Sequence, residues 1–470
     1  MNIITKKTLV AIVLLLFVKH GFSQESVPVF KSKSDSSTYY STLKLMRSHN
    51  PLSTKRVRMD SLWEIQQSIM KNGILGWQYV YKADETFVPV KALINKEIEP
   101  TSVKKLSIEN FEGKKIPAEV FACKNLEELE LVNTNIRKIP KKLNGLSKLY
   151  ALEIYNNQSP KKLRLTKNSH ITFLKIRNNK PGRTPSNFRK FPALDSLDLC
   201  RNFLTSFPNI DKNTALRKLV LSENNLTLEN FKVKRNESLQ TLYIRKNKIQ
   251  VVPDEIGNFK ALKKLSFNYN EIIEIKNGIA NLQSLEEFSL YQNKLSKIPK
   301  SLYQLKSLKE IDLYYNQIER IEDEIANLKK LEILYLSNNR IHTLSDNIGE
   351  LTNLRELYLH HNRVSHFPAT LSKLSKLKIL RFNDNSFAAF PDPILSLKNI
   401  ENLDMSRNQL QSIPSEFGTY KKLQLLIMSE NPWEDKDTMT AFATKMRSNG
   451  TIVQLNVPTT EIEEVSPKQD

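Results

Sequence analysis

The sequence predicts an α/β fold: a right-handed, horseshoe-shaped solenoid with a parallel sheet on its concave face and short helical turns on its convex face. Three observations predict it. A leucine or isoleucine recurs every 23 residues from Leu216 to Leu423. Within each unit, apolar residues occupy positions 1, 4, 6, 11, 14, 18 and 21, and position 9 is almost always asparagine. One such unit cannot bury its own apolar face, so the repeat indicates stacked coils that share a core.

Each unit is expected to hold one strand and one turn of helix. The unit that opens at Leu308 reads LKEIDLYYNQIERIEDEIANLKK. Positions 4 and 6 alternate with polar residues, as in a half-buried strand, whereas positions 14, 18 and 21 have helix-like spacing. The frame extends backward in steps of 22 or 23 residues and gives about fifteen units, with the earlier ones opening at Val103, Leu126, Leu149, Ile171 and Leu194.

Position 9 marks the point where the chain leaves the strand, so backbone groups there lose their partners inside the core. Asparagine supplies both a donor and an acceptor, and the recurrence predicts a buried ladder that bonds to the main chain of adjacent coils. Only the first two units lack it, with Phe111 and Thr134 at this position. Proline at position 15 of nine units fits the start of a helical turn.

Residues 1–23 are predicted to be a secretory signal peptide, because Lys6 and Lys7 precede the apolar run Leu9 to Val18. This run is shorter than the roughly 20 residues that span a bilayer, and no second apolar run follows. The mature chain is therefore expected to lack a transmembrane segment and to be periplasmic, cell-surface or secreted.

The ends of the solenoid need atypical covering elements. Residues 24–98 are interpreted as an N-terminal region and cap. Within it we expect residues 24–35 to be disordered, a short helix from Ser61 to Gly73 and a strand from Trp77 to Tyr81. The repeats occupy 99–433.

After the repeats, residues 434–457 are interpreted as a C-terminal cap, and 458–470 as a disordered tail. The cap should contain an amphipathic helix from Thr438 to Arg447 and a strand from Thr451 to Leu455.

Tyrosines gather on the expected concave face. At positions 5, 7 and 8 they are predicted to form a nearly contiguous partner-binding patch edged by two histidines: Tyr243, Tyr269, Tyr291, Tyr314, Tyr315, Tyr335, Tyr358, His360 and His361. Rings of this size anchor protein partners at little entropic cost. The alternative is that cross-strand ring pairs only stabilise the sheet. His361 should neighbour Asp384, but positions 7 and 8 are expected to point apart, which disfavours a metal site.

Formal net charge is +21, and +18 once Lys6, Lys7 and Lys19 are removed with the signal peptide (21 − 3). Concave positions hold equal numbers of basic and acidic residues, whereas residues 161–190 hold ten basic residues and no acidic one. This run is either a solvated flank or a site for an anionic glycan or lipid surface, with these candidates: Lys161, Lys162, Arg164, Lys167, Lys175, Arg177, Lys180 and Arg183. Its lack of interleaved aromatic residues argues against nucleic acid.

No catalytic, nucleotide-binding or metal-binding motif stands out, so we expect no enzyme activity, cofactor or metal. The two cysteines, Cys123 and Cys200, fall three units apart on opposite limbs and should not pair.

The consensus LxxLxLxxNxLxxIPxxIxxLxxL, as in the unit from Leu239 with Pro253, resembles the 23-residue leucine-rich repeats of Ras-group-related plant proteins, Ras-binding scaffolds and many bacterial proteins. The resemblance covers about 330 of 470 residues. It implies the solenoid fold and says little about the partner. The signal peptide and the absence of cysteine-rich caps favour a bacterial exported member. The leading hypothesis is a non-enzymatic protein-binding scaffold, and the alternative is an envelope-associated structural or adhesion protein.

Overall fold

The computed structural model describes residues 24–30, 74–81 and 86–455, and the chain divides into two compact units. One comprises Met1–Ile136 with Glu153–Gln158, and the other Arg137–Leu152 with Ser159–Asp470. The predicted signal peptide, the predicted helix over 61–73 and the predicted tail over 458–470 lie outside the described residues.

In the first unit, β1 (Gln24–Phe30) pairs antiparallel with β2 (Ile74–Tyr81). The strand predicted over 77–81 is confirmed. The expected disorder of residues 24–35 is wrong over 24–30, because Val27 and Val29 give this segment the alternation of a strand. Its partner lies about fifty residues away in the sequence, so the pairing has no local signal.

The first solenoid coils of this unit hold a parallel ladder. Their elements are β3 (Val88–Pro89), α4 (Val90–Ile94), η2 (Pro100–Ser102), β4 (Lys105–Glu109), the 3-10 turn η3 (Ala118–Ala122) and β5 (Glu128–Val132).

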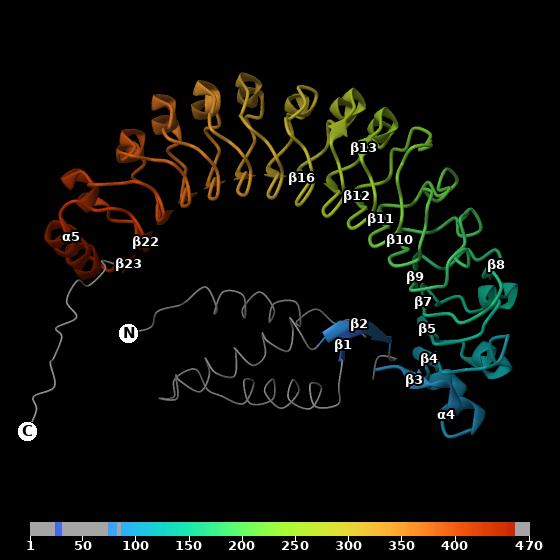
Figure 1. The fold of residues 1–470 in the computed structure, drawn as a ribbon. Coiled ribbons are helices and arrows are strands. Elements are labelled where there is room, and N and C mark those ends of the chain that lie inside the picture. Colours follow the sequence, from blue (N-terminus) through green and yellow to red (C-terminus); the bar gives the residue numbers. More distant parts are fainter. Residues whose placement is uncertain (1–23, 31–73, 82–85, 456–470) are drawn as a thin grey trace, which may run out of the picture. The chain divides into compact units, whose positions relative to one another are not determined.

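The second unit contains a long parallel sheet, which confirms the predicted strand of each coil. Each strand pairs with the next along the chain: β9 (Phe173–Arg177), β10 (Ser196–Asp198), β11 (Lys218–Val220), β12 (Thr241–Tyr243), β14 (Lys264–Ser266), β16 (Glu287–Ser289), β17 (Glu310–Asp312), β18 (Ile333–Tyr335), β19 (Glu356–Tyr358), β20 (Ile379–Arg381), β21 (Asn402–Asp404), β22 (Leu425–Ile427) and β23 (Ile452–Gln454). Figure 1 shows that these strands line the inner side of the curve made by this unit.

Residues at equal repeat positions lie opposite one another in this sheet. Asp312 is opposite Tyr335, and Tyr335 is opposite Tyr358. The repeat frame therefore decides which side chains become neighbours. The remaining strands are β7 (Ala151–Tyr155) and two short return-limb pairs, β6 (Lys138–Ile139) with β8 (Arg164–Leu165), and β13 (Val251–Val252) with β15 (Glu274–Ile275).

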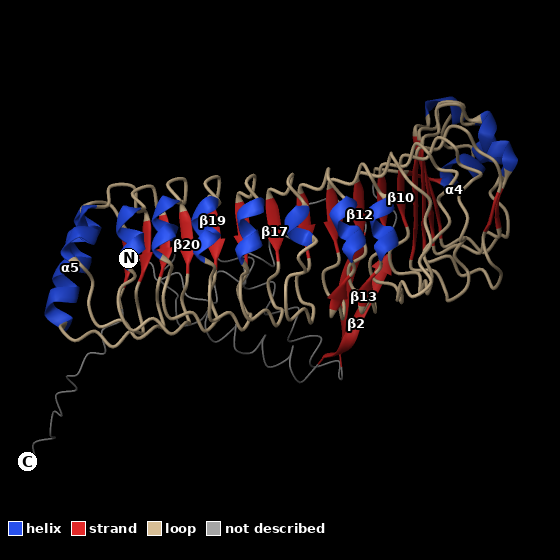
Figure 2. Ribbon diagram, turned by 90° about the horizontal axis from the view of Figure 1, so that it is seen from above, coloured by secondary structure: helices blue, strands red, loops and turns tan. Residues whose placement is uncertain are grey.

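The predicted helical turns are present as 3-10 turns on the limb opposite the strands (Figure 1), and Figure 2 shows the turns of successive coils side by side. They are η4 (Lys141–Gly145), η5 (Asp254–Asn258), η6 (Asn277–Asn281), η7 (Leu302–Gln304), η8 (Asp323–Asn327), η9 (Asp346–Glu350), η10 (Ala369–Lys373), η11 (Asp392–Ser396) and η12 (Ser415–Thr419). Prolines such as Pro253 and Pro368 stand just before a turn, with extended backbone, rather than inside it.

The core consists of the leucines and isoleucines of the repeat, nearly all fully buried. The asparagine ladder is confirmed beside it. Asn316, for example, donates through Nδ2 to the carbonyls of Leu290 and Leu313 and accepts at Oδ1 from the amide of Leu295. One side chain thus bonds to two coils, as the buried position requires.

The solenoid is followed by α5 (Lys436–Ser448) and β23, as predicted for the helix and the strand. Asp435 caps the helix by accepting from the amide of Thr438. The helix buries Met439, Ala443 and Met446.

Candidate functional site

Position 8 of every coil has a left-handed backbone, which sets the direction of the side chains at the rim of the sheet. All fifteen residues have φ between 50° and 59°: Asn110, Asn133, Asn156, Asn178, Arg201, Glu223, Lys246, Tyr269, Gln292, Tyr315, Asn338, His361, Asp384, Arg407 and Glu430. Such a conformation costs an L residue about 1–2 kcal/mol. The ladder asparagine that follows at position 9 makes the bonds that hold this turn.

This turn brings the side chains of positions 7 and 8 together. Ring centroids are 4.6 Å apart for Tyr314 and Tyr315 and 5.4 Å apart for His360 and His361. The expectation that these positions point apart is therefore wrong, because it assumed a strand-like backbone through position 8.

A continuous series of rings results, which we call the ring row: Tyr269, Tyr291, Tyr314, Tyr315, His360 and His361. The centroid of Tyr291 lies 5.1 Å from that of Tyr269 and 5.5 Å from that of Tyr314. These separations fall in the range of favourable edge-to-face ring contacts.

The row crosses the coil that lacks a ring at position 7. Ser337 is small, so Tyr314 reaches His360, and its hydroxyl lies 2.7 Å from His360 Nε2. Ser337 Oγ lies 2.8 Å from Nδ1 of the same imidazole. Burial, followed by the nearby His361, lowers the pKa of His360 to about 4. The imidazole is therefore neutral near pH 7 and can bond to both hydroxyls.

Charged residues extend the row at both ends. Lys246 Nζ lies 5.6 Å from the ring centroid of Tyr269. At the other end, His361 Nδ1 lies 3.2 Å from Asp384 Oδ2, as expected from the register. Arg407 then contacts Asp384 at 3.6 Å and Glu430 at 2.8 Å.

The remaining tyrosines do not join this row. Tyr335 and Tyr358 form a stacked pair, with centroids 4.8 Å apart and planes at 16°. Tyr243 lies instead under Arg245, whose guanidinium carbon is 4.4 Å from the ring centroid. The predicted patch is thus divided, because Ser266, Ser289 and Asp312 occupy position 5 on the three strands between Tyr243 and Tyr335.

Carboxylates surround the stacked pair. Glu356 accepts a hydrogen bond from the Tyr358 hydroxyl, 2.8 Å away, and Asp312 accepts from Ser289 Oγ at 2.7 Å. The carboxylate of Glu310 has no hydrogen bond or ion pair among the described residues. Burial, then Glu287 and Asp312, raise its pKa. The centre of the concave face therefore gathers several carboxylates, and Lys264 acts on Glu310 only through its field, without an ion pair.

Three members of the ring row are exposed: Tyr269, Tyr315 and His361. Tyr269 and Tyr315 expose 42% and 44% of their surface, while the other site tyrosines are half-buried. Burial, as the largest cause, raises the pKa of Tyr314 and of Tyr335 to about 12. These phenols are protonated at neutral pH and present hydroxyl donors.

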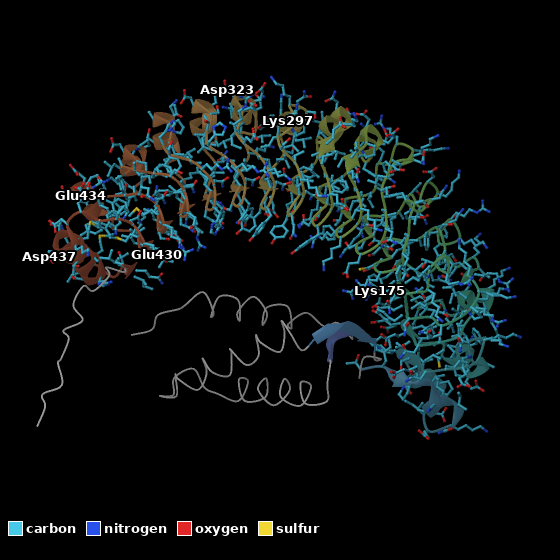
Figure 3. The ribbon with its side chains drawn as sticks, viewed as in Figure 1. Lys175, Lys297, Asp323, Glu430, Glu434 and Asp437 are labelled. Atoms are coloured by element: carbon cyan, nitrogen blue, oxygen red, sulfur yellow. The ribbon has the colours of Figure 1, made fainter. Side chains whose placement is uncertain are left out.

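The predicted basic site lies on two different limbs. Lys175 and Arg177 belong to β9, and Figure 3 shows Lys175 on the concave side, opposite Lys297 and Asp323 on the convex side. Arg177 is already paired with Asp198. The others are exposed in the limb segments that join the strands: Lys161, Lys162, Arg164, Lys167, Lys180 and Arg183.

One basic cluster was missed by sequence reasoning. Lys162 borders a cavity together with Arg189 and Lys190, which had been counted in the basic run but not chosen as site residues. The available signal was the step of 22 rather than 23 residues in the coil that opens at Leu149, together with the basic run itself.

Other chemistry finds little support in the described part of the chain. No group of three or more His, Cys, Asp or Glu side chains is placed there to hold a metal ion. The helices seen in these ranges are too short or too polar to cross a membrane. Cys123 and Cys200 are buried free thiols, and burial raises the pKa of Cys200 to about 12.

Comparison with known proteins gives a consistent result. The family model described as a leucine-rich repeat region matches residues 176–324 and 318–466, more than half of the chain. No curated protein matches the sequence. The fold is a scaffold typical of protein-binding domains, and the family and its structural neighbours are generally non-enzymatic.

Solved structures with this fold include proteins from bacteria, plants and animals. A leucine-rich-repeat protein of Leptospira interrogans is 27% identical, with a TM-score of 0.60, over 78% of this chain and 99% of its own. An internalin of Listeria monocytogenes is 21% identical, with a TM-score of 0.50, over 76% and 88%. Drosophila Toll, solved in complex with Spätzle, is 21% identical, with a TM-score of 0.58, over 70% and 50%. With its repeat frame, asparagine ladder and matching family model, the chain belongs to the leucine-rich-repeat family.

Proposed function

We propose that this protein is an exported, non-enzymatic scaffold that binds a protein partner on its concave face between Tyr243 and Tyr358. The observation that carries the proposal is the ring row, in which exposed rings rest on half-buried ones. Tyr269 and Tyr315 present ring surface to solvent, and Tyr291 and Tyr314 support them from the side.

Such rings are ordered before the partner arrives. Tyr314 is fixed by its contact with His360 and by its ring contacts, so little side-chain entropy remains to be lost on binding. Pre-ordered tyrosines that keep exposed surface are typical of binding hot spots. The alternative that the rings only stabilise the sheet explains the half-buried members but not the exposed ones.

Charge adds a requirement on the partner. Glu310 lies near the stacked pair and makes no ion pair or side-chain hydrogen bond among the described residues, and burial raises its pKa although Lys264 acts in the opposite direction. A lysine or arginine of the partner placed there would neutralise Glu310 and could pack on the face of Tyr335. We therefore propose a partner surface with a basic residue at its centre.

Export rests on residues 1–23, whose sequence has the features of a secretory signal peptide. The bacterial internalin and Leptospira folds support an exported bacterial protein. The place would be the periplasm, the cell surface or the medium.

The test uses the purified mature chain as bait on envelope and medium fractions, followed by affinity measurement with the partner it identifies. In Tyr269→Asn with Tyr315→Asn the left-handed backbone is kept, because asparagine already stands at position 8 of other coils. We expect at least about tenfold weaker binding. Tyr150→Asn removes an equally exposed ring, at 43%, outside the ring row and should leave affinity unchanged. If the parent protein, the double variant and Tyr150→Asn bound the partner with equal affinity, the proposal would be refuted.

A further inference from the structure

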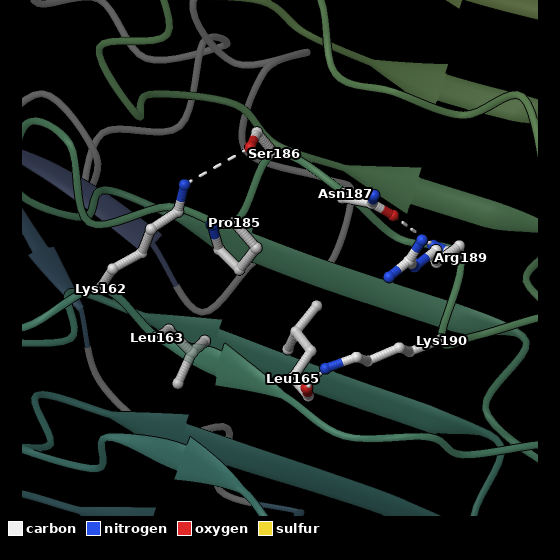
Figure 4. A pocket seen from close by; sticks show the side chains of 8 residues that line it. All are labelled: Lys162, Leu163, Leu165, Pro185, Ser186, Asn187, Arg189 and Lys190. Atoms are coloured by element: carbon white, nitrogen blue, oxygen red, sulfur yellow. Dashed lines mark hydrogen bonds between the residues drawn. The ribbon is translucent and has the colours of Figure 1, made fainter.

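A cavity opens between two consecutive return limbs early in the second unit. Its volume is about 240 Å³, and its lining is basic, polar and apolar: Lys162, Leu163, Leu165, Pro185, Ser186, Asn187, Arg189 and Lys190. Figure 4 shows the two limbs on either side, with Lys162 on one and Arg189 and Lys190 on the other.

The limbs depart from the regular 23-residue frame here. The coil that opens at Leu149 is only 22 residues long, and its β8 aligns Leu165 with Ile139 of the preceding coil, so Leu165 takes the buried apolar place and Lys162 lies exposed before it. In the next coil Asn187 pairs with Asn209.

Backbone bonds close the gap at both ends. The amide of Leu163 donates to the carbonyl of Arg183 at 3.1 Å, and that of Asn168 donates to the carbonyl of Lys190 at 3.0 Å. Between these two bonds one limb has four residues, 164–167, and the other has six, 184–189, so the two limbs differ in length where they border the cavity.

Its charge is entirely positive. Lys162 Nζ lies 3.4 Å from Ser186 Oγ, and Lys190 Nζ donates to the carbonyl of Leu165 at 2.8 Å. Arg189 is exposed, and its guanidinium makes no ion pair in the described structure. The lining includes no carboxylate, and neither does the rest of residues 161–190.

We infer that this cavity binds a phosphate group carried on a small molecule or on a lipid headgroup. The guanidinium of Arg189 can bind two phosphate oxygens at once, and the two ammonium groups supply further charge. Leu163, Leu165 and Pro185 form an apolar floor for the carrier. The volume lies below the roughly 300–1,000 Å³ of sites for drug-sized ligands, so the ligand is compact. This site lies off the concave face and is independent of the proposed protein binding.

The test compares two double variants of the mature protein that lose the same charges. Lys162→Gln with Arg189→Gln removes two cavity cations. Lys161→Gln with Arg164→Gln removes one lysine and one arginine from the same basic run, and neither of these residues lines the cavity. All four are exposed, so both variants should melt like the parent protein.

Three probes are titrated at low salt: inorganic phosphate, glycerol 3-phosphate, and phosphatidylcholine vesicles containing phosphatidylglycerol. We expect glycerol 3-phosphate to bind, and the cavity variant to bind it at least about tenfold more weakly, since it loses charge-assisted contacts. The matched variant should bind glycerol 3-phosphate less than about threefold more weakly than the parent protein, because exposed charges outside the cavity act only through a screened field. Binding of the vesicles that the cavity variant loses would identify a headgroup as the source of the phosphate, and binding of glycerol 3-phosphate alone would identify a soluble ligand.

Equal weakening in both variants would overturn the inference, because it would show a diffuse basic field without a site. Failure of the parent protein to bind any of the three probes would overturn it as well.

Discussion

Asn316→Ala tests the ladder that holds the coils together, because this side chain serves two coils at once. Asn316 is 8% exposed. Its Nδ2 donates to the carbonyls of Leu290 and Leu313 at 3.0 and 3.1 Å, and its Oδ1 accepts from the amide of Leu295 at 3.1 Å. Its Nδ2 also donates to the carbonyl of Tyr314 at 3.4 Å, and alanine removes all four bonds.

The losses are unequal. The carbonyl of Leu290 still accepts from Asn293 Nδ2, and that of Leu313 still accepts from Asn339 Nδ2. The Leu295 amide has no other acceptor among the described residues. Its burial without a partner sets the expected loss of unfolding free energy at about 1–3 kcal/mol.

Urea denaturation followed by circular dichroism measures this loss, and hydrogen exchange at the Leu295 amide reports the local effect. Asn353→Ala is the matched control, because Asn353 donates to the carbonyl of Lys329 from an exposed site. It should change stability by less than about 0.5 kcal/mol. If Asn316→Ala were no more destabilising than Asn353→Ala, the ladder would not contribute as argued.

Three further predictions concern packing and charge. In Gly278→Ala the new Cβ would lie 2.0 Å from the carbonyl oxygen of Asp254. Urea denaturation should therefore show a loss of about 1–3 kcal/mol in the free energy of unfolding. The control Gly145→Ala places its Cβ where no atom lies within 4 Å and should leave the free energy of unfolding unchanged. Glu310→Gln should raise the free energy of unfolding at pH 7 by less than about 1 kcal/mol, because the folded state disfavours the charged form of Glu310, as its raised pKa indicates. The gain should vanish at about pH 3, where the carboxyl is protonated. A gain that persisted there would contradict this explanation. His360 has a pKa of about 4 in the folded state, below its usual 6.5. The unfolded chain therefore binds the proton first, and stability falls as the pH drops from 6.5 to 4. Over this range the melting temperature of His360→Gln should fall less than that of the parent protein, and an identical fall would show that His360 does not cause the pH dependence.

The repeat could be predicted from sequence because every coil restates the same requirement. An apolar residue at position 6 is buried in each coil, and so is the asparagine at position 9 in most of them. A pattern imposed many times is robust to the exceptions at Phe111 and Thr134. The parallel register followed from the period without any further information.

The site depended on features that the repeat does not encode. Position 8 is left-handed in every coil, yet it accepts Arg201, Glu223, Tyr269 and His361 as well as asparagine. Because so many residue types occur, composition gives no clear signal there, and the directions of positions 7 and 8 were predicted wrongly. The five asparagines at this position were the one hint, since asparagine tolerates positive φ.

The cavity shows the opposite case, in which a break in the repeat accompanies the site. The coil that opens at Leu149 is 22 residues long, and Leu165 takes the buried place opposite Ile139, which leaves Lys162 outside the core. The basic run drew attention to charge, whereas the shortened coil marks where the limbs leave the regular frame. Departures from the repeat frame are therefore a useful guide to sites in such a chain beside charge density.

The ladder and the ring row occupy adjacent positions of the same turn, so stability and binding should be coupled locally. Asn316 follows Tyr315 directly, and its bonds hold the left-handed backbone that directs this ring. Asn408 makes the same ladder bonds behind Arg407, outside the ring row. We expect Asn316→Ala and Asn408→Ala to lose similar unfolding free energy, about 1–3 kcal/mol each. Only Asn316→Ala should weaken binding of the partner. Equal affinities for the partner would show that the backbone turn does not order the ring, and that the exposed tyrosine is held by its neighbouring rings alone.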